Sequence, residues 1–569
     1  MIRMKVCWLV CLGVLQVVTL LIISWNTAPG WDEWGHLPSG LSHLQYNRFE
    51  AYRVNPPLVR MIAAIPVLIA NGGLDFFVAM DYPGCRPEWN LAKNYQQQHG
   101  DACFTNFAIA RSALLFVPLA GTVLIWQLGH RWFGDAIGWI PAVLWVFSPT
   151  VLAFGASITP DVPSAVAGLW CILLFWNWLE KSSWEQTVRF GFALSICLLC
   201  KFSWVILPPL LIAIWLIRII YQKRRLPIRE LMQWFVVSCI VIFVINACYG
   251  FQDIGKQLGK YDFVSQTLIG NKSTPPDIAA YGNRFRGTWL GSIPVPVPED
   301  YALGIDIQKR DFELKMPSYF LGQWRDHGWI EYYAVAILLK EPIALWGLFT
   351  LTFFSAFRNK SLCWTVEKCV VIIPGIAIFV FVSLQTGFNH HLRYVLPFFP
   401  VLFLASVGTL RDSGRKIHLA AYALTMGYVV SSITILPRSY AFFTEAVGGA
   451  TEGWRYLGDS NLDWGQDLMT LKRWLVNNPS SQDSYLLYSI DLVDAKLLDI
   501  KVQDGKRHQR RSNGNNLYPT VVGRWIVFSR PLMSPEGEWF RYRTPDLILS
   551  PTIRIYNVNE RDLMPIESK

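Results

Sequence analysis

Two adjacent carboxylates follow the first apolar run of this chain, in the segment Trp31–His36. Asp32 and Glu33 stand where a membrane span ends and a long polar loop begins, a place that suits acid–base chemistry on a substrate carried by a lipid. His36 comes one helical turn after Asp32, so it is a candidate to orient this carboxylate or share a proton with it. The alternatives are a solvated helix cap for the acidic pair and a structural role for the histidine.

A third acidic residue, Asp161, follows Thr159 and Pro160 at the junction of two apolar stretches. A carboxylate with apolar flanks is costly unless it is paired or binds a cation, a metal or a hydroxyl group. Two interpretations stay open at this point. Asp161 belongs to a polar site at the mouth of two spans, or it caps the helix that begins near Val162.

Three basic residues are candidates for binding a phosphate. The planar guanidinium of Arg393 binds phosphate oxygens in pairs, and Lys201 lies between two short apolar runs. Lys340 belongs to the triplet Lys340–Pro342, which interrupts an apolar window and predicts a broken helix beside a polar cavity. The alternatives are side chains of Arg393 and Lys201 that merely extend to the membrane surface, and a local salt bridge between Lys340 and Glu341.

A polar cluster, Asp459–Asp467, opens the C-terminal part of the chain. Asp463 offers carboxylate oxygens, and Trp464 offers a flat apolar face of the kind that stacks on sugars. Turn capping before a helix at Leu468 is the simpler explanation. The spacing lacks the glycine and the terminal glutamate of an EF-hand, and the adjacent pair His390-His391 does not have the spacing of a zinc site.

The cysteines indicate one disulfide candidate. Of the 11 cysteines, only Cys85 and Cys103 lie well inside segments that we expect outside the cytoplasm. A bridge between them would close a loop of about eighteen residues, and two free thiols are the alternative. The single Cys-x-x-Cys motif, at 197–200, lies inside an apolar stretch and does not predict a metal site.

The composition identifies an α-helical polytopic membrane protein. Hydrophobic residues make up 52% of the 569 residues and charged residues 16%, which is too apolar for a soluble protein. The first apolar run is long for a secretory signal, so we expect a retained span. The net charge of +10 does not require a nucleic acid partner, because basic residues gather on the cytoplasmic side of membrane proteins.

Apolar windows of spanning character predict about eleven transmembrane helices. They fall at 6–25, 105–128, 136–154, 162–179, 188–200, 203–220, 231–248, 332–356, 369–385, 395–410 and 417–435. With a cytoplasmic N-terminus, nearly all Lys and Arg residues of the short loops lie inside, and only Lys201 and Arg393 lie in short outside loops. We therefore expect a C-terminus outside the cytoplasm.

This topology predicts two domains. Residues 1–435 form the transmembrane domain, with extracytoplasmic loops at 26–104 and 249–331. The run Leu58–Ala70 is too short to span and is expected to lie on the membrane surface. The second loop is rich in Gly and Pro, as at 291–298, and is expected to be irregular. Residues 436–569 are expected to form a small α+β domain, with a helix near Leu468–Leu475 and strands near Ser484–Ile490 and Val521–Ser529.

Over residues 1–435 the order of these motifs resembles the integral-membrane glycosyltransferases of the GT-C fold. The nearest resemblance is to bacterial relatives of the protein O-mannosyltransferase and aminoarabinose transferase group. The features that carry it are Asp32-Glu33 after the first span, Asn55-Pro56-Pro57-Leu58, Thr159-Pro160-Asp161, Arg393-Tyr394-x-Leu396-Pro397 and, in the tail, Asp459–Asp467.

The resemblance implies an inverting glycosyltransferase that uses a polyprenyl-phosphate-linked sugar. Asp32 would be the general base, Glu33 and Asp161 would hold hydroxyl groups, and Arg393 with Lys201 or Lys340 would bind the donor phosphate. The candidates for acceptor or sugar binding are His36, Asn55, His391, Asp463 and Trp464. No obligatory metal cofactor is expected, with a divalent cation as the alternative.

The acceptor class stays open between a lipid, a glycan and a protein. Two other function classes stay open. One is a transporter or lipid flippase, which would also carry charged residues at cavity mouths but is disfavoured by the two large outside loops. The other is a non-catalytic envelope assembly protein, for which the aromatic-rich loops would be a docking surface. Convergence of Asp32, Asp161 and Arg393 in one pocket would favour the enzyme. Helical spans, rather than a barrel, indicate the inner membrane.

Overall fold

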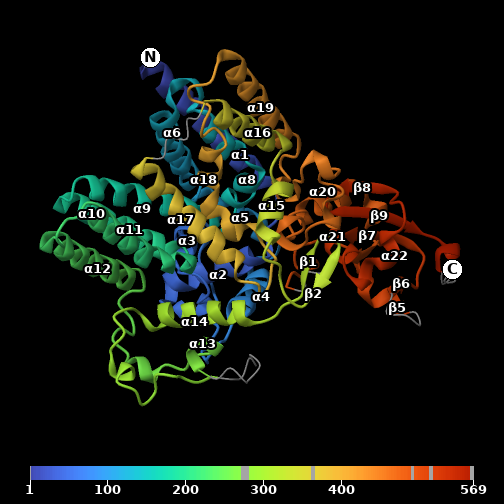
Figure 1. Cartoon of the computed structure of the whole chain (residues 1–569). Helices are drawn as coiled ribbons and strands as arrows, with labels where there is room; N and C mark the ends of the chain where they lie inside the picture. The colour runs from blue at the N-terminus through green and yellow to red at the C-terminus, as the bar shows by residue number, and fades with distance from the viewer. Residues whose placement is uncertain (1, 271–280, 360–364, 489–491, 512–516, 564–569) are drawn as a thin grey trace.

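The chain forms a large helical body with a small β-containing domain at one side of it (Figure 1). The structure, a computed structural model, describes residues 2–270, 281–359, 365–488, 492–511 and 517–563. The predicted fold class is confirmed, because apolar helices are followed by a C-terminal region that mixes short helices with strands.

Seven helical stretches of the described chain are long and apolar enough to cross a membrane. They contain α1 (Ile2–Asn26); α4 (Glu88–His99), α5 (Cys103–Ser112) and α6 (Phe116–Ile137) as one run; α9 (Asp161–Glu180); η3 (Phe202–Ile206) with α11 (Leu207–Tyr221); α12 (Ile228–Cys248); α17 (Val366–Ser383); and α19 (Arg415–Thr434). The pair α15 (Tyr332–Lys340) and α16 (Ile343–Asn359) makes an eighth if it is one span, bent by 108°.

The other predicted windows hold shorter or interrupted helices. They are α7 (Ile140–Phe147) with α8 (Pro149–Gly155), α10 (Trp184–Cys200), and η6 (Leu392–Phe398) with α18 (Phe399–Ala405). Proline accounts for the first interruption, because Pro149 has no backbone N–H to continue α7 and starts α8 instead. Each of the eleven windows therefore corresponds to helical structure, although not each is one continuous span.

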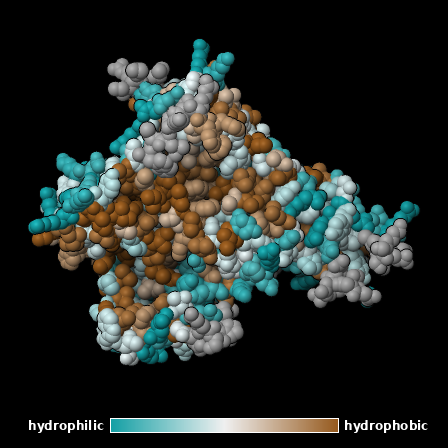
Figure 2. All heavy atoms as spheres, viewed as in Figure 1, coloured by the Kyte–Doolittle hydropathy of each residue, from teal (hydrophilic) through white to brown (hydrophobic). Residues whose placement is uncertain are grey.

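The surface of the helical body is apolar in a broad belt. Figure 2 shows hydrophobic residues gathered over this body, with hydrophilic residues near the N-terminus and over the C-terminal domain. Large apolar side chains stand exposed here, including Ile217 and Ile220 on α11 and Phe235 and Phe243 on α12. Exposed apolar area of this extent suits lipid rather than water, which supports a multi-pass membrane protein.

The first loop contains two helices that pack against each other. α2 (Trp31–Tyr46) and α3 (Leu58–Asn71) pack closely, and a Cβ atom at Gly40 would lie 2.3 Å from the carbonyl oxygen of Arg60. α3 begins after Pro57 and has 14 residues, too few to span a membrane. Its bounds match the predicted surface helix.

The second loop carries more order than predicted. Besides α13 (Gln266–Ile269) it contains α14 (Glu299–Glu313) and an antiparallel hairpin, β1 (Ser318–Phe320) and β2 (Gln323–Arg325). The Gly- and Pro-rich run before α14 holds only the short 3₁₀ turn η5 (Leu290–Ser292), as its composition suggests.

The C-terminal region is built on a five-stranded mixed sheet of order β4-β3-β7-β9-β8. The strands are β3 (Tyr485–Leu487), β4 (Gln503–Asp504), β7 (Gly523–Phe528), β8 (Leu547–Ser550) and β9 (Ile553–Val558). β5 (Gln509–Arg511) and β6 (Leu517–Pro519) form a separate hairpin, and the helices are α20 (Leu468–Asn477), α21 (Ser529–Leu532) and α22 (Glu538–Arg541). α20, β3 and β7 lie where the sequence predicts them, with positions 489–490 of the first predicted strand outside the described residues.

Candidate functional site

Four charged side chains from four separate segments meet in one cluster, which we call the charged cluster. Asp32 lies in the first turn of α2, Asp161 begins α9, Lys201 follows α10 and Arg393 lies in η6. Arg393 donates through Nη1 to Asp161 Oδ2 at 3.0 Å and through Nη2 to Asp32 Oδ2. Lys201 Nζ donates to Asp161 Oδ1 at 2.5 Å. The structure thus brings together two predicted carboxylates and two predicted phosphate-binding cations.

Asp32 is the member of the charged cluster that reaches the surface. Its side chain is 22% exposed, whereas those of Asp161, Lys201 and Arg393 are 1%, 3% and 3% exposed. Both oxygens of Asp161 accept bonds from the two cations, and pairing of this kind is what makes buried charges tolerable. Asp161 therefore holds Lys201 and Arg393 in place, and its paired oxygens do not support the predicted role of binding hydroxyl groups.

Aromatic rings surround the two cations. The Arg393 guanidinium carbon lies 4.8 Å from the ring centre of Trp464, and the Lys201 ammonium lies 4.8 Å from that of Tyr394. The Nε atom of Arg393 is buried and has no hydrogen-bond partner among the described residues. Because the surroundings are apolar, charges here interact strongly, and Nε keeps one donor for a further acceptor.

The C-terminal region forms part of this site. Trp31 N donates to the carbonyl oxygen of Trp464 at 3.0 Å, and Ala28 N donates to that of Gln466 at 2.8 Å. A Cβ atom at Gly30 would lie 2.1 Å from Trp464 Cε3, so only glycine allows this approach. The segment that leads into Asp32 is thereby held against the tail.

Glu33 is structural, contrary to the predicted catalytic or binding role. Its carboxylate is buried and accepts two bonds from Arg111, at 2.8 and 2.6 Å. The backbone N–H groups of Gly30 and Ile158 donate to the same carboxylate, each at 2.8 Å. These four hydrogen bonds use the carboxylate oxygens of Glu33 inside the protein. Glu33 therefore fixes the start of α2 against the segment before Asp161.

Sequence reasoning missed Arg111, although a signal was present. An arginine inside the apolar window 105–128 requires an acidic partner, and Glu33 is the acid that supplies it. Arg111 also donates to three backbone carbonyls near the end of α1, those of Ser24, Thr27 and Ala28.

Lys340 does not face a donor phosphate, which contradicts its predicted role. Its ammonium donates to the backbone carbonyls of Tyr440, Phe442 and Asn461, which account for its three N–H groups. The broken helix is confirmed by the bend between α15 and α16. The alternative of a Lys340–Glu341 salt bridge is not what holds this bend, because Glu341 instead accepts bonds from Ser148 and Tyr428.

His36 and Asn55 lie beside the charged cluster. They lie around a small internal gap together with Ile158 and Pro160, and Pro160 directly precedes Asp161. His36 Nδ1 accepts a bond from Arg60 Nε at 3.3 Å. Burial, with Arg60 and Arg393 nearby, holds the pKa of His36 well below its usual range, so the imidazole is neutral at pH 7. A proton shared between His36 and Asp32 is therefore disfavoured.

A second group of charged and polar side chains lies beside the charged cluster and is partly exposed. His391 Nδ1 lies 2.8 Å from Ser460 Oγ and 3.4 Å from Asp459 Oδ1. Arg530 of α21 lies 3.6 Å from Asp459 Oδ2, and its guanidinium carbon lies 6.0 Å from the ring centre of Trp31. Burial acts to raise the pKa of Asp459, but His391 and Arg530 outweigh it and hold this pKa at about 2.

Asp463 and Trp464 are buried and are not the exposed sugar platform that the sequence predicts. Asp463 Oδ2 accepts a bond from the backbone of Arg530 at 3.2 Å. Burial, with Asp467 nearby, raises the pKa of Asp463 to about 7. The Trp464 ring instead makes a cation–π contact with the Arg393 guanidinium.

Cys85 and Cys103 are free thiols, which contradicts the predicted disulfide and agrees with its alternative. Cys85 Sγ lies 3.6 Å from both Arg53 Nη1 and the Met80 carbonyl oxygen, whereas Cys103 Sγ lies 3.9 Å from the carbonyl oxygen of Tyr95. Each thiol is buried in its own surroundings.

An apolar groove approaches the charged cluster from the helical body. It lies between α3, α6, α9 and α10 and has a volume of about 580 Å³. Pro163 of α9, two residues after Asp161, is among its lining residues. One wall of the groove therefore lies close to Asp161. Within the described ranges no group of three His, Cys, Asp or Glu side chains has the geometry to hold a metal ion.

Comparison with known proteins gives one family match. Residues 104–249 match the family described as dolichyl-phosphate-mannose-protein mannosyltransferase. This stretch contains α9, with Asp161, and Lys201, two members of the charged cluster. No curated protein matches the chain.

Solved structures similar to this chain include two of ArnT from Cupriavidus metallidurans. The apo structure has 12% sequence identity and a TM-score of 0.43, and the structure bound to undecaprenyl phosphate has 11% identity and a TM-score of 0.44. Each comparison covers 98% of this chain and 99% of the other. The family match bears out, over residues 104–249, the resemblance to membrane glycosyltransferases that the sequence motifs indicate.

Proposed function

We propose that this protein is a membrane glycosyltransferase that moves a sugar from a polyprenyl-phosphate donor to a hydroxyl group of an acceptor outside the cytoplasm. The observation that carries the proposal is the charged cluster, in which Asp32 opens to the surface beside the buried Arg393. The family match over residues 104–249 supports a lipid-phosphate-linked sugar as donor.

Arg393 and Lys201 are the cations for the donor phosphate. Both lie on the buried side of Asp32, and Arg393 Nε is a free donor aimed at no protein group of the described chain. The apolar groove offers room for isoprenoid units, whose burial is worth about 0.8 kcal/mol per methylene group. A phosphate at this position competes with Asp32 for Arg393, so that donor binding releases the Asp32 carboxylate.

Asp32 then acts as general base. It takes the proton of the acceptor hydroxyl, whose oxygen attacks the anomeric carbon from the side opposite the phosphate. The bond between that carbon and the phosphate oxygen breaks, the phosphate leaves on Arg393 and Lys201, and the configuration is inverted. General-base assistance contributes about 10²- to 10⁴-fold, and electrostatic stabilisation of the leaving phosphate adds to it.

The convergence of Asp32, Asp161 and Arg393 supports the enzyme over the two other classes that the sequence left open, a transporter or flippase and an assembly protein. A transporter would place charged residues along a path through the membrane. In this protein the charged residues gather around Asp32, a single carboxylate that faces the surface. We expect no obligatory metal, since two buried cations already face the phosphate position.

The test is sugar transfer by the purified full chain in lipid nanodiscs. A panel of radiolabelled polyprenyl-phosphate sugars is offered with a membrane extract as acceptor, using wild type, Asp32→Asn and a matched control, Asp81→Asn. Asp81 lies in the same loop and pairs with an arginine, but its side chain is 57% exposed. Transfer by wild type and Asp81→Asn alone supports the proposal, and the absence of transfer from every donor contradicts it.

A further inference from the structure

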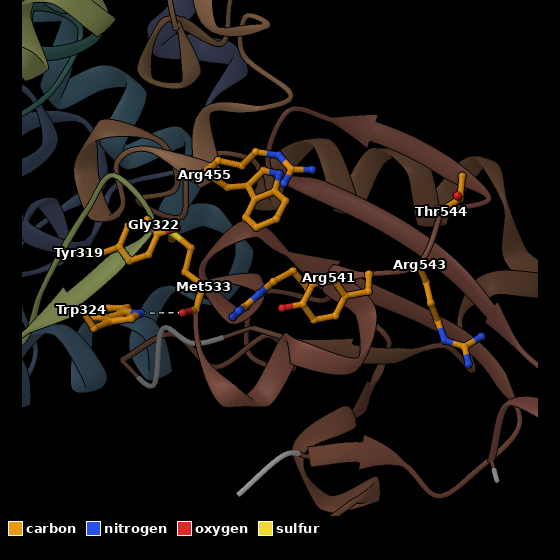
Figure 3. A pocket seen from close by; sticks show the side chains of 10 residues that line it. Tyr319, Gly322, Trp324, Arg455, Met533, Arg541, Arg543 and Thr544 are labelled. Atoms are coloured by element: carbon orange, nitrogen blue, oxygen red, sulfur yellow. Dashed lines mark hydrogen bonds between the residues drawn. The ribbon is translucent and has the colours of Figure 1, made fainter. Parts of the chain in front are cut away.

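A second polar pocket lies in the C-terminal region. It has a volume of about 530 Å³ and opens between the β1–β2 hairpin, the loop before residue 456 and the segment around α22 (Figure 3). Its lining residues are Tyr319, Gly322, Trp324, Trp454, Arg455, Met533, Arg541, Tyr542, Arg543 and Thr544. Neither the charged cluster nor the apolar groove shares a lining residue with it.

The pocket carries an excess of positive charge. Three of its lining residues are arginines and none is acidic. Arg455 pairs with Glu452 and Arg543 pairs with Asp562, whereas Arg541 donates to the backbone carbonyls of Leu532 and Ser534. Arg541 thus has no carboxylate partner within the described chain, and Figure 3 shows it beside Met533 with Arg455 on the opposite side.

Aromatic rings line the same pocket and are open to solvent. Tyr542 is 79% exposed and Trp324 is 51% exposed. The Trp324 indole is held by a bond from Nε1 to the carbonyl oxygen of Met533, at 2.7 Å (Figure 3). Rings with an exposed face offer apolar area to a sugar ring, and guanidinium groups bind phosphate or carboxylate oxygens in pairs.

One short helix joins this pocket to the site at Asp32. Arg530 of α21 lies over Trp31, the residue before Asp32, and Met533 lines the pocket three residues later. Three residues of a helix span about 5 Å along its axis. The pocket therefore lies within reach of Arg530 and Trp31 for a saccharide of a few units.

We infer that this pocket binds an anionic sugar, one that carries a phosphate or a carboxylate, in the acceptor glycan. Arg541 and Arg455 take the anionic group, and Trp324 and Tyr542 take the ring. The assignment of this sugar to the acceptor depends on the proposed transferase function, but its binding does not.

Binding is measured on the full chain in nanodiscs by saturation-transfer NMR with glucose 1-phosphate as probe. Glucose and inorganic phosphate are separate arms, the latter as a competitor. The variants are Arg541→Gln, Arg455→Gln and Tyr542→Ala, with Arg507→Gln as control because Arg507 is an 83% exposed arginine of the same region. Arg455 is 57% exposed, so its replacement tests the site even where Arg541→Gln fails to fold.

We expect saturable binding of glucose 1-phosphate that weakens at least tenfold in each pocket variant, is unchanged in Arg507→Gln, and exceeds that of glucose at least tenfold. Binding that ignores the pocket variants overturns the inference. Complete displacement by inorganic phosphate with no effect of Tyr542→Ala also overturns it, since the site is then one for free anions. Transfer without probe binding defeats the inference alone, whereas probe binding without any transfer defeats only the proposed function.

Discussion

Arg393 and Asp32, which are 361 positions apart in the chain, form a direct ion pair at the surface end of a buried charged cluster. The other end of the same guanidinium is held by Asp161, which Lys201 neutralises in turn. A single arginine thus connects a buried carboxylate with one that opens to the surface.

The close approach of Gly30 to Trp464 predicts that Gly30→Ala damages the site without changing its charge. The added methyl group would meet the indole at 2.1 Å, and overpacking of this kind costs about 1–3 kcal/mol. We expect a lower unfolding temperature and transfer reduced at least tenfold.

The matched control is Gly427→Ala on α19, where the nearest atom is 3.8 Å from the added carbon. Equal behaviour of the two variants in thermal unfolding and in transfer would show that the contact with Trp464 does not hold the segment before Asp32.

The buried pair of Glu33 and Arg111 predicts a large loss of stability when one partner is removed. Arg111→Met leaves the Glu33 carboxylate buried without its cation, which costs about 3–5 kcal/mol. Arg189→Met is the control, since its partner Glu185 is 66% exposed and surface pairs contribute about 0–1 kcal/mol. Unfolding followed by size-exclusion chromatography after heating checks this, and comparable midpoints for the two variants would contradict a structural role of Glu33.

The raised pKa of Asp463 predicts that stability falls as the pH rises. In the folded protein this pKa is about 7, against about 4 in the unfolded chain, so the folded state binds more protons between these values. The free energy of unfolding therefore decreases over this range, by up to about 1.4 kcal/mol per pH unit, and levels off above pH 7. Asp463→Asn removes this contribution.

The measurement is the difference in unfolding temperature between Asp463→Asn and wild type at pH 5 and at pH 8. The variant should gain relative to wild type at pH 8. A difference that is the same at both pH values would mean that the Asp463 carboxyl does not titrate in this range.

The apolar groove predicts an effect that depends on donor chain length. Ala167→Trp places a large side chain in the groove and should raise KM for a long polyprenyl-phosphate donor at least fivefold, with a smaller effect on a short-chain donor. Val188→Trp, at a 52% exposed position of α10, is the control for bulk added outside the groove. Identical KM values for long and short donors in Ala167→Trp would place the isoprenoid chain elsewhere.

The sequence predicts the elements and the main charges of this protein well, and their partners less well. Each predicted apolar window coincides with helical structure in the described chain, and costly charges at the mouths of these windows point to Asp161, Lys201 and Arg393 because such charges need partners. Which partner each finds depends on distant packing. Glu33 and Lys340 are charged residues beside apolar windows, as Asp32 and Lys201 are. In the structure, however, Glu33 is bound by Arg111, and Lys340 is bound by three backbone carbonyls.

The contribution of the C-terminal region to the site was only partly predictable. The sequence singles out Trp464 as an aromatic of interest, but its burial beneath Arg393 follows from contacts between residues 28–31 and 464–466 that no local pattern encodes. The arginines of the second pocket are likewise dispersed between residues 455 and 543, and only the fold gathers them.

The central claim, that Asp32 performs the proton transfer while Arg393 and Lys201 hold the donor phosphate, is tested most directly by separating donor binding from turnover in Asp32→Asn. The measurement is the single-turnover rate of sugar transfer at saturating donor, with the donor dissociation constant determined on the same preparation. We predict a rate reduced at least 10³-fold with donor binding unchanged or tighter, because the amide frees Arg393 for the phosphate. A rate within threefold of wild type would contradict the assignment of Asp32 as general base.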